Sequence, residues 1–396
     1  MTIESEKKDE KKYRILSLDG GGIRGVLSAR ILKKVEEILE TKGHKLHTYF
    51  DLVAGTSTGS ILAAGIACKK SAGDMIGLYR DEGKKIFPNS VRSARKRRWL
   101  SQLFGDKVQK FLTKPFGIKV LYPNQDGEPG LAQVLQEKLG PAKLSDIKEL
   151  CILIPAYDVK YRNTTWFCNF DDEPQWYDNI ELWKICTASA AAPTFFPPYK
   201  LFSDKDGYLP HIDGGVSANN PSLIAIARAF ELDKTSNWSN IAVLSIGTAQ
   251  TTKSYEYEEV EKWGLASWAK NIPNIFMDPA AISSETICRR MMTMQVGSDR
   301  NYLRLSFDLK KFCNEEYTNI SKQEKKKKKD MIEEIDNPNN FKELIKAAEW
   351  YLEKGDVIKY ENKKYARMQG VIEGIEDFIN SNPKPKPIID SNSKPN

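Results

Sequence analysis

Residues 47–67 read HTYFDLVAGTSTGSILAAGIA and contain the turn Gly55-Thr56-Ser57-Thr58-Gly59. The residues before this turn, 47–54, are rich in β-formers and predict a strand. The residues after it, 60–67, are apolar and predict the start of a buried helix. Ser57 is therefore expected on a sharp strand-to-helix turn, where Gly55 and Gly59 leave room that any Cβ would fill. A serine in this setting is a candidate nucleophile.

A second glycine-rich turn, Asp19-Gly20-Gly21-Gly22-Ile23-Arg24-Gly25, lies upstream. Residues 13–19 alternate as a strand does, and residues 26–40 carry apolar side chains at helical spacing, so this turn also joins a strand to a helix. Consecutive glycines let several backbone N–H groups point at one spot, which a tetrahedral oxyanion requires. We interpret the turn as a candidate oxyanion loop.

The same turn also fits the dinucleotide-binding fingerprint. Gly20, Gly22 and Gly25 have its G-x-G-x-x-G spacing between a strand and a helix. That fingerprint needs an acidic residue at the end of the second strand. Here the second strand ends in Gly-Thr-Ser-Thr-Gly, and Asp51 lies inside or before it. A nucleotide-binding oxidoreductase is therefore the less favoured alternative.

A third segment, residues 209–221, holds Asp213-Gly214-Gly215. Asp-Gly-Gly is common in turns. This copy follows a run of small residues, 187–192, which indicates closely packed backbone beside a site. Asp213 is thus a candidate base, although a solvated aspartate has a pKa near ~3.9 and is a weak base. Burial beside the apolar residues 195–198 would have to raise that pKa. His211 would face the same side of a strand as Asp213, so a Ser57–His211 pair stays an alternative.

Four segments follow one another along the chain, at 19–25, 55–59, 188–198 and 213–221, and the third reads Ala-Ser-Ala-Ala-Ala-Pro-Thr-Phe-Phe-Pro-Pro. In this order they resemble the patatin-like phospholipases, from about Tyr13 to about Leu352. The resemblance implies a three-layer α/β fold with a largely parallel central sheet flanked by helices. It implies a dyad without histidine, in which Ser57 is the nucleophile and Asp213 the proton acceptor. It assigns the oxyanion hole to Gly20, Gly21, Gly22 and Arg24, and the remaining motif positions are Gly25, Gly55, Gly59, Gly214 and Gly215.

The resemblance further implies a carboxylic ester hydrolase of the phospholipase A2, phospholipase A1 or lysophospholipase type. Such an enzyme cleaves fatty-acyl esters through an acyl-enzyme, needs no cofactor or metal, and has membrane phospholipids or other acyl lipids as partners. A catalytically weak storage or membrane-binding protein of the same family is the alternative. The Asn- and Lys-rich composition is typical of an AT-rich genome, and we expect a bacterial member. Some bacterial relatives need an activator, and the sequence identifies none.

The composition is that of a globular protein of 396 residues, long enough to bury a large core. Residues 1–12 are charged and contain no apolar segment like that of a signal peptide. No apolar run approaches the ~20 residues of a membrane span. We therefore expect a cytoplasmic protein, associated peripherally with membranes. The six cysteines show no metal-ligand spacing and are interpreted as free, buried thiols.

Two basic runs contribute to the net charge of +7. In residues 92–104, Arg95, Lys96, Arg97 and Arg98 run directly into Trp99, and this mixture predicts docking on an anionic bilayer. An ordinary solvated face is the alternative there. The second run, Lys325 to Lys329, has no aromatic residues and is interpreted as an exposed loop or helix start. Nucleic-acid binding is not expected.

Strand signals at 13–19, 47–54, 150–157, 164–170 and 241–247 alternate with helical segments. This alternation predicts an α/β fold with its site at the carboxyl edge of the sheet. The expected organisation is a charged mobile arm (1–12), a catalytic domain (13–355), a C-terminal helical extension (356–382) and a disordered tail (383–396). The extension is expected to be helical because its apolar residues from Met368 to Ile379 have helical spacing.

Overall fold

The computed structural model describes residues 12–87, 130–193, 195–232, 238–250, 255–296, 300–361 and 364–385. The predicted docking segment 92–104, with Arg95, Lys96, Arg97, Arg98 and Trp99, lies outside these ranges, as do residues 1–11 of the predicted arm. Within the described ranges, no helix is both long enough and apolar enough to cross a membrane.

An eight-stranded sheet forms the centre of the molecule, in the order β5-β6-β3-β2-β1-β7-β8, with β4 also paired to β3. β3, β2, β1, β7 and β8 run parallel, whereas β4 and β6 run antiparallel to β3, and β5 antiparallel to β6. The strands are β1 (Tyr13–Leu18), β2 (Leu52–Gly55), β3 (Cys151–Asp158), β4 (Asn163–Cys168), β5 (Tyr199–Ser203), β6 (Gly207–Asp213), β7 (Ile241–Ile246) and β8 (Tyr302–Leu305).

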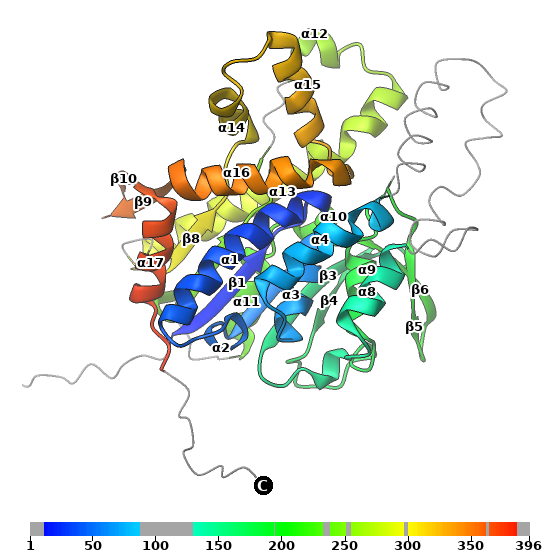
Figure 1. The fold of residues 1–396 in the computed structure, drawn as a ribbon. Coiled ribbons are helices and arrows are strands. Elements are labelled where there is room, and N and C mark those ends of the chain that lie inside the picture. Colours follow the sequence, from blue (N-terminus) through cyan, green and yellow to red (C-terminus); the bar gives the residue numbers. More distant parts are fainter. Residues whose placement is uncertain are drawn as a thin grey trace, which may run out of the picture.

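Helices cover both faces of this sheet (Figure 1). Along β1 the side chains alternate, so Leu16 and Leu18 pack on one face and Ile15 on the other. The first face carries α1 (Gly25–Thr41), α3 (Thr58–Ala67), α4 (Ala72–Ile86), α8 (Leu131–Leu139), α9 (Leu182–Ser189) and α16 (Phe341–Lys354). The second carries α11 (Ser222–Leu232) and α13 (Leu265–Val296). The predicted three-layer α/β fold is confirmed.

The remaining short elements connect these layers. They are α2 (Leu46–Tyr49), α10 (Gly215–Ala218), α12 (Tyr257–Val260), α14 (Leu309–Glu316), α15 (Lys322–Ile332) and the 3-10 turns η1 (Gly22–Arg24), η3 (Leu144–Asp146), η4 (Trp238–Asn240) and η5 (Pro338–Asn340). In Figure 1, α12, α14 and α15 stand above the sheet, on the side that the carboxyl end of β1 approaches.

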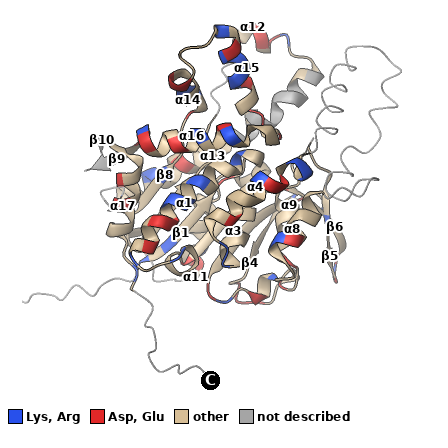
Figure 2. Ribbon diagram, viewed as in Figure 1, with Lys and Arg blue, Asp and Glu red and all other residues tan. Residues whose placement is uncertain are grey.

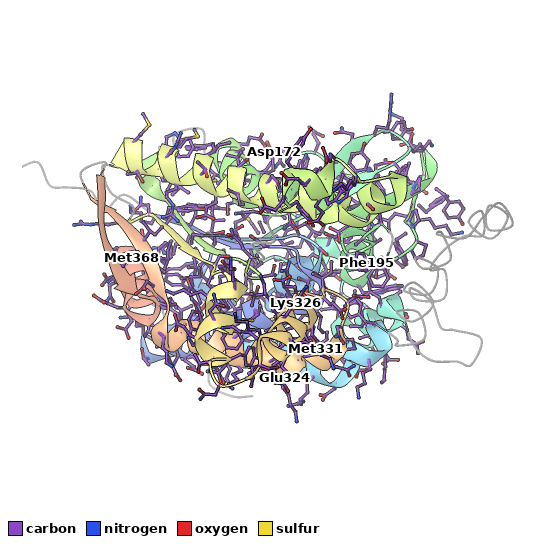
Figure 3. All side chains as sticks on the ribbon, turned by 90° about the horizontal axis from the view of Figure 1, so that it is seen from above. Asp172, Phe195, Glu324, Lys326, Met331 and Met368 are labelled. Atoms are coloured by element: carbon purple, nitrogen blue, oxygen red, sulfur yellow. The ribbon has the colours of Figure 1, made fainter. Side chains whose placement is uncertain are left out.

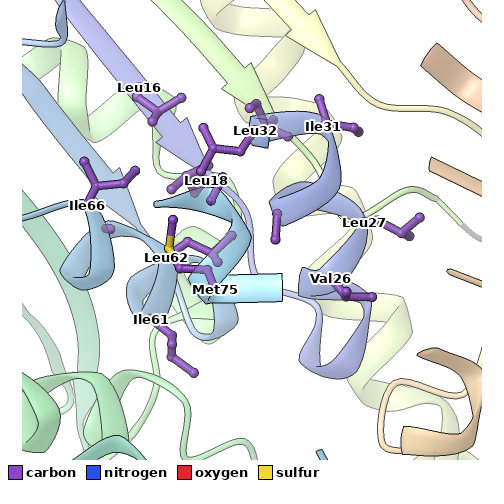
Figure 4. Packing of buried hydrophobic residues seen from close by; sticks show 14 of the residues in the cluster. Leu16, Leu18, Val26, Leu27, Ile31, Leu32, Ile61, Leu62, Ile66 and Met75 are labelled. Carbon is purple, nitrogen blue, oxygen red and sulfur yellow. The ribbon is translucent and has the colours of Figure 1, made fainter. Parts of the chain in front are cut away.

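The core between β1 and the helices α1, α3 and α4 holds the two glycine turns against each other. Figure 4 shows Leu18, Leu27, Leu62 and Met75 among its closely packed side chains. Full burial of each such side chain contributes ~1.5–3 kcal/mol. At the start of α1, a Cβ on Gly25 would lie 2.1 Å from Thr58 Oγ1, so only glycine permits this approach of α1 to α3.

The strand predicted over 47–54 is wrong in its first half. Residues Leu46–Tyr49 form helix α2, and β2 begins at Leu52. The aromatic side chains of Tyr49 and Phe50 are buried in the core, where they pack edge-to-face on each other. Their β-forming character therefore reflects burial and not strand pairing, because tertiary packing overrides local propensity.

The helical extension predicted over 356–382 is also wrong in its first half. β9 (Asp356–Glu361) and β10 (Lys364–Gly370) pair as an antiparallel hairpin, and only α17 (Val371–Ser381) is helical. Met368 lies on β10, not on the predicted helix. Val357 is buried and Ile358 is exposed, as expected for successive residues of a strand, but both are apolar, so the sequence does not show this alternation.

The end of α17 is tied to the amino end of β1. Arg14 Nε donates to the carbonyl oxygen of Asn382 at 3.0 Å, and its guanidinium also donates to that of Pro383. Lys384 Nζ lies 3.0 Å from Asp51 Oδ1. The first residues of the tail predicted to be disordered are therefore bound to the core, and residues 386–396 lie outside the described ranges.

Candidate active site

Ser57 lies between β2 and α3, at the carboxyl edge of the sheet. Its backbone has φ 55° and ψ −121°, a conformation that non-glycine residues rarely adopt. The flanking glycines make this turn possible. A Cβ on Gly55 would lie 2.2 Å from the Gly59 carbonyl oxygen, and one on Gly59 would lie 2.1 Å from that of Leu18. The predicted strand-to-helix elbow at Ser57 is present.

Ser189, at the end of α9, holds this elbow in place. The Ser57 N–H donates to Ser189 Oγ at 3.0 Å, and Ser189 Oγ donates to the Pro155 carbonyl oxygen at 2.6 Å. The elbow is thereby fixed to β3. Sequence reasoning missed this role of Ser189, and its signal was the run of small residues from 187 to 192.

Asp213 is the last residue of β6 and lies opposite Ala156 of β3. Its side chain is buried, at 1% exposure. Oδ1 accepts the Gly215 N–H at 2.7 Å, and Oδ2 makes no hydrogen bond within the described part of the chain. Burial raises the pKa of Asp213 to about 6, while interactions with the Ser57 hydroxyl and the Gly215 N–H partly oppose this rise. The predicted elevation of this pKa by burial agrees with the structure.

The segment that follows Asp213 ties the three sequence motifs together. The Gly20 N–H donates to the Asn219 carbonyl oxygen at 3.0 Å, and Thr56 Oγ1 donates to that of Ala218 at 2.6 Å. The Asp213 segment is thus bonded to the glycine loop and to the turn that carries Ser57. These bonds hold the segment after Asp213 against the turn that carries Ser57.

His211, the alternative base, is occupied elsewhere. Its ring is fully buried, with Nε2 at 3.0 Å from Thr165 Oγ1 and Nδ1 at 3.1 Å from the Leu209 carbonyl oxygen. Phe167 and Trp176 pack against it, and burial lowers the pKa of the imidazole. Both ring nitrogens therefore have partners other than Ser57, which disfavours the Ser57–His211 pair.

Only some of the N–H groups predicted to form the oxyanion hole lie at the cavity. Gly21 and Gly22 line the same cavity as Ser57 and Asp213, and their N–H groups have no acceptor among the described residues. The Gly20 N–H is engaged by Asn219, and the Arg24 N–H donates to the Gly21 carbonyl oxygen at 3.2 Å. The structure thus places Gly21 and Gly22 at the cavity, but not Gly20 or Arg24.

A distant segment fixes the conformation of this loop. Gly22 has a positive φ of 59°, and a Cβ there would lie 2.3 Å from the Ile335 carbonyl oxygen. The same oxygen accepts the Ile23 N–H at 2.8 Å. On the other side of the loop, Thr248 Oγ1 donates to the Gly20 carbonyl oxygen at 2.9 Å. Sequence reasoning identified neither Ile335 nor Thr248.

A buried ion pair lies at the start of the loop. Arg304, from β8, binds both carboxylate oxygens of Asp19, with Nη1–Oδ1 at 2.9 Å and Nη2–Oδ2 at 2.5 Å. Arg304 Nη1 also donates to Ser245 Oγ at 2.8 Å, and each side chain of the ion pair is 4% exposed. The Arg24 side chain lines a small polar cavity next to this pair and not the cavity at Ser57. Sequence reasoning missed Arg304 altogether.

Ser57 and Asp213 open into an apolar cavity of about 240 Å³. Helices α3, α4 and α8 supply one wall, and the segment after α9 supplies another. The lining residues are Gly21, Gly22, Ser57, Thr58, Ile61, Tyr79, Ile86, Phe87, Leu131, Ala190, Ala192, Pro193, Phe195, Phe196, Asp213, Val216 and Ile335. A largely apolar pocket with a few convergent polar groups suits a ligand with a hydrocarbon chain and one reactive polar group.

A serine on a strained strand-to-helix elbow, a buried carboxyl group and an apolar cavity together define a serine esterase or lipase in broad terms. The chain belongs to the patatin-like phospholipase family, whose model matches residues 16–226. Membership of this family supports hydrolysis of lipid acyl esters in the same broad sense.

Several plant relatives align with most of this chain. Patatin-like protein 4 of Arabidopsis thaliana is 31% identical over 74% of this chain and 76% of its own length. Patatin-T5 of Solanum tuberosum is 32% identical over 74% of this chain and 75% of its own length. Among solved structures, VipD from Legionella pneumophila aligns with 89% of this chain and 68% of its own length, at 13% sequence identity and a TM-score of 0.35. A bacterial source for this chain stays a prediction.

Family membership alone does not establish catalysis. Probable inactive patatin-3-Kuras 1 of Solanum tuberosum is 31% identical over 74% of this chain and 77% of its own length. A relative named "probable inactive" thus lies at the same level of similarity as the others. The case for activity in this chain therefore depends on its own site.

Proposed function

We propose that this protein is a lipid acyl hydrolase that cleaves fatty-acyl esters of membrane glycerolipids, with Ser57 as nucleophile and Asp213 as base. One observation carries the proposal. A serine in a strained elbow and a buried carboxyl group with a pKa of about 6 line the same apolar cavity. A base with a pKa close to neutral is both ionised at pH 7 and able to accept a proton.

The reaction follows from these positions. Ser57 Oγ attacks the ester carbonyl carbon while Asp213 Oδ2, which has no hydrogen bond among the described residues, accepts the hydroxyl proton. Collapse of the tetrahedral intermediate breaks the bond to the alcohol, which leaves with the proton from Asp213. Water then attacks the acyl-enzyme, Asp213 accepts a proton from it, and the fatty acid is released as the Ser57 hydroxyl is restored.

The oxyanion formed in both steps is assigned to the N–H groups of Gly21 and Gly22. They line the cavity and have no acceptor in the described part of the chain. The N-terminus of α3, directly after Ser57, adds a favourable dipole. Loss of one oxyanion-hole donor typically costs ~3 kcal/mol of transition-state stabilisation.

The lining of the cavity favours an acyl chain over a nucleotide. Ile61, Ile86, Leu131 and Phe196 provide apolar contacts and no hydrogen bonds for a ribose or base. A pyrophosphate bound at the glycine loop would meet the Asp213 carboxylate in the same cavity. Both features disfavour the dinucleotide-binding alternative.

Phospholipids, lysophospholipids and galactolipids all present suitable esters, and we infer that the enzyme acts on them at a membrane surface in the cytoplasm. The cations Arg95, Lys96, Arg97 and Arg98 and the side chain of Trp99 stay a proposed contact with anionic lipid. They lie outside the described residues, so this contact rests on the sequence alone.

The decisive experiment compares wild type with Ser57→Ala, Asp213→Asn and His211→Ala. Release of fatty acid from phospholipid vesicles and hydrolysis of a soluble short-chain ester are measured for each. The serine and aspartate variants should lose nearly all activity on both substrates, because the two groups act as a unit. His211→Ala should retain most of it. A wild type that binds vesicles without releasing fatty acid would instead identify a storage or membrane-binding protein.

A further inference from the structure

Helix α15 has an unusual concentration of positive charge. Its sequence, KQEKKKKKDMI, contains six lysines and two acidic residues, and Ile332 is its only buried residue. Lys328 lies 3.6 Å from Glu343, and Lys329 lies 3.8 Å from Glu333. Lys326 and Lys327 are exposed, and neither has a carboxylate oxygen within 4 Å in the part of the chain that the structure describes.

The chain segment that follows this helix forms part of the wall of the candidate active-site cavity. Ile335 lines the cavity three residues after the end of α15, and its carbonyl oxygen accepts the Ile23 N–H of the glycine loop at 2.8 Å. Figure 3 looks down on the molecule from above and labels Lys326 on α15 and, at a separate place, Phe195, which also lines the cavity. In Figure 2, Lys and Arg residues are visible along α15.

The lining of the cavity includes an exposed apolar side chain. Val216, on α10, lines the cavity and is 48% exposed. Exposed hydrocarbon at the cavity and exposed lysines on the helix that precedes Ile335 are the two features found at membrane-binding faces, where cations meet head groups and apolar groups enter the interface.

We propose that the exposed lysine face of α15, centred on Lys326 and Lys327, docks the protein on an anionic lipid bilayer and sets the cavity against the membrane surface. The proposal rests on the proposed function, since docking is useful to an enzyme whose substrate lies in the bilayer. The exposed apolar side chain at the cavity favours a bilayer over a nucleic acid, because a nucleic acid offers no partner for Val216.

The test measures binding to vesicles in a background that cannot hydrolyse them. Proteins carrying Ser57→Ala are mixed with vesicles of phosphatidylcholine alone or of phosphatidylcholine with phosphatidylserine, and bound protein is measured by co-sedimentation. Lys326→Gln with Lys327→Gln should weaken binding to the anionic vesicles about thirtyfold. Each cation near such a surface contributes about 1 kcal/mol, and 1.4 kcal/mol corresponds to a factor of ten.

Lys45 and Lys205 provide a matched control at the opposite edge of the sheet. Lys45 precedes β2, and Lys205 lies between β5 and β6, at the end of β6 away from Asp213, and both are exposed. Lys45→Gln with Lys205→Gln removes the same charge and should leave vesicle binding within a factor of about two, because both sites lie farther from the docked surface than a Debye length of about 8 Å.

The outcomes separate docking from catalysis. Equal weakening by the two double variants, or no weakening by Lys326→Gln with Lys327→Gln, would overturn the proposal in favour of diffuse charge. A loss confined to binding of single-stranded RNA, with vesicle binding intact, would overturn it in favour of nucleic acid. In the presence of Ser57, the α15 double variant should hydrolyse a soluble short-chain ester at the wild-type rate. Failure of wild type on that ester would count against the proposed function and leave the docking result standing.

Discussion

The Gly215 amide N–H binds Asp213 through one carboxylate oxygen, Oδ1, at 2.7 Å. The other oxygen, Oδ2, makes no hydrogen bond in the described part of the chain and lies in a buried environment. One oxygen thus fixes the orientation of the carboxyl group while the other stays available for a proton. This division suits the proposed general base that works without a histidine, and it predicts that activity follows the protonation state of Asp213.

The rate of ester hydrolysis should fall as the pH drops through about 6. Burial raises the pKa of Asp213 to about 6, so below that pH the carboxyl group is protonated and cannot accept the Ser57 proton. Measurement of kcat/KM on a soluble ester from pH 4.5 to 8.5, all at matched ionic strength, should give a rise that levels off above about pH 7. A midpoint near 4 would show that the group controlling the rate titrates as a solvated carboxyl group, which contradicts a buried Asp213 with a raised pKa as the base.

Replacement of Asp213 by Asn should stabilise the protein at neutral pH while it abolishes activity. A carboxyl group whose pKa is raised from 3.8 to about 6 on folding is penalised when it ionises, by about 3 kcal/mol. The wild type is therefore more stable when Asp213 is protonated than when it is ionised. This contribution to the free energy of unfolding is fully present below pH 3.8 and is lost as the pH rises through about 6. Urea unfolding should therefore show Asp213→Asn more stable than wild type at pH 8, with the difference shrinking toward pH 4. Equal stability at both pH values would contradict the burial argument.

Two substitutions of Ser57 should be equally inactive but differ in stability. The Ser57 backbone has φ 55° and ψ −121°, and strain of this kind costs ~1–3 kcal/mol. Ser57→Ala keeps this strain, whereas Ser57→Gly relieves it because glycine adopts positive φ readily. Thermal unfolding should thus place the glycine variant above the alanine variant, and both should fail to hydrolyse ester. An alanine variant with residual acyl-enzyme formation would remove Ser57 from the mechanism.

The turns at the site were predictable because their signals are local. Glycines follow the ends of β1 and β2, and they reveal the loop with Gly21 and Gly22 and the turn with Ser57. These two turns lie together because the carboxyl ends of neighbouring parallel strands meet at one edge of the sheet. Asp213 was located by its motif and the resemblance. Its approach to Ser57 along the antiparallel strand β6 was not predicted from periodicity.

The supports of the site could not be predicted in the same way. Arg304 lies 285 residues from Asp19 along the chain, and Ile335 is even farther from Gly22, so no local pattern links either pair. The lysine run at 325–329 has no apolar periodicity, so the sequence alone does not decide between an exposed loop and a helix start. The structure makes it helical, and the helix begins with a capping box in which Ser321 and Glu324 satisfy each other's backbone N–H groups.

Alanine at Gly22 should inactivate the enzyme, and a control glycine separates strain from collision. Gly22 has φ 59°, and a Cβ there would lie 2.3 Å from the Ile335 carbonyl oxygen, so the loop must shift. Gly140 has φ 71°, but a Cβ there would meet nothing within 4 Å. Both variants should lose about 1 kcal/mol of stability from the strained φ, with a further loss at Gly22. A fall in kcat should follow only Gly22→Ala; comparable kcat values for both variants would count against its role in the oxyanion loop.

The buried pair of Arg304 and Asp19 should control both the stability of the fold and the geometry of the glycine loop. Arg304→Met leaves the Asp19 carboxylate buried without a partner, and such a change typically costs ~3–5 kcal/mol. Because Asp19 begins the loop that presents Gly21 and Gly22, kcat measured on the folded fraction should fall while KM changes little. Adding Asp19→Asn removes the unpaired charge, so the double variant should regain part of the lost stability in urea unfolding. It should not regain kcat, because the two-point contact that holds the loop is still absent. Strictly additive losses of stability would show that the two side chains are not coupled. An unchanged kcat in Arg304→Met would confine the pair to a purely structural role.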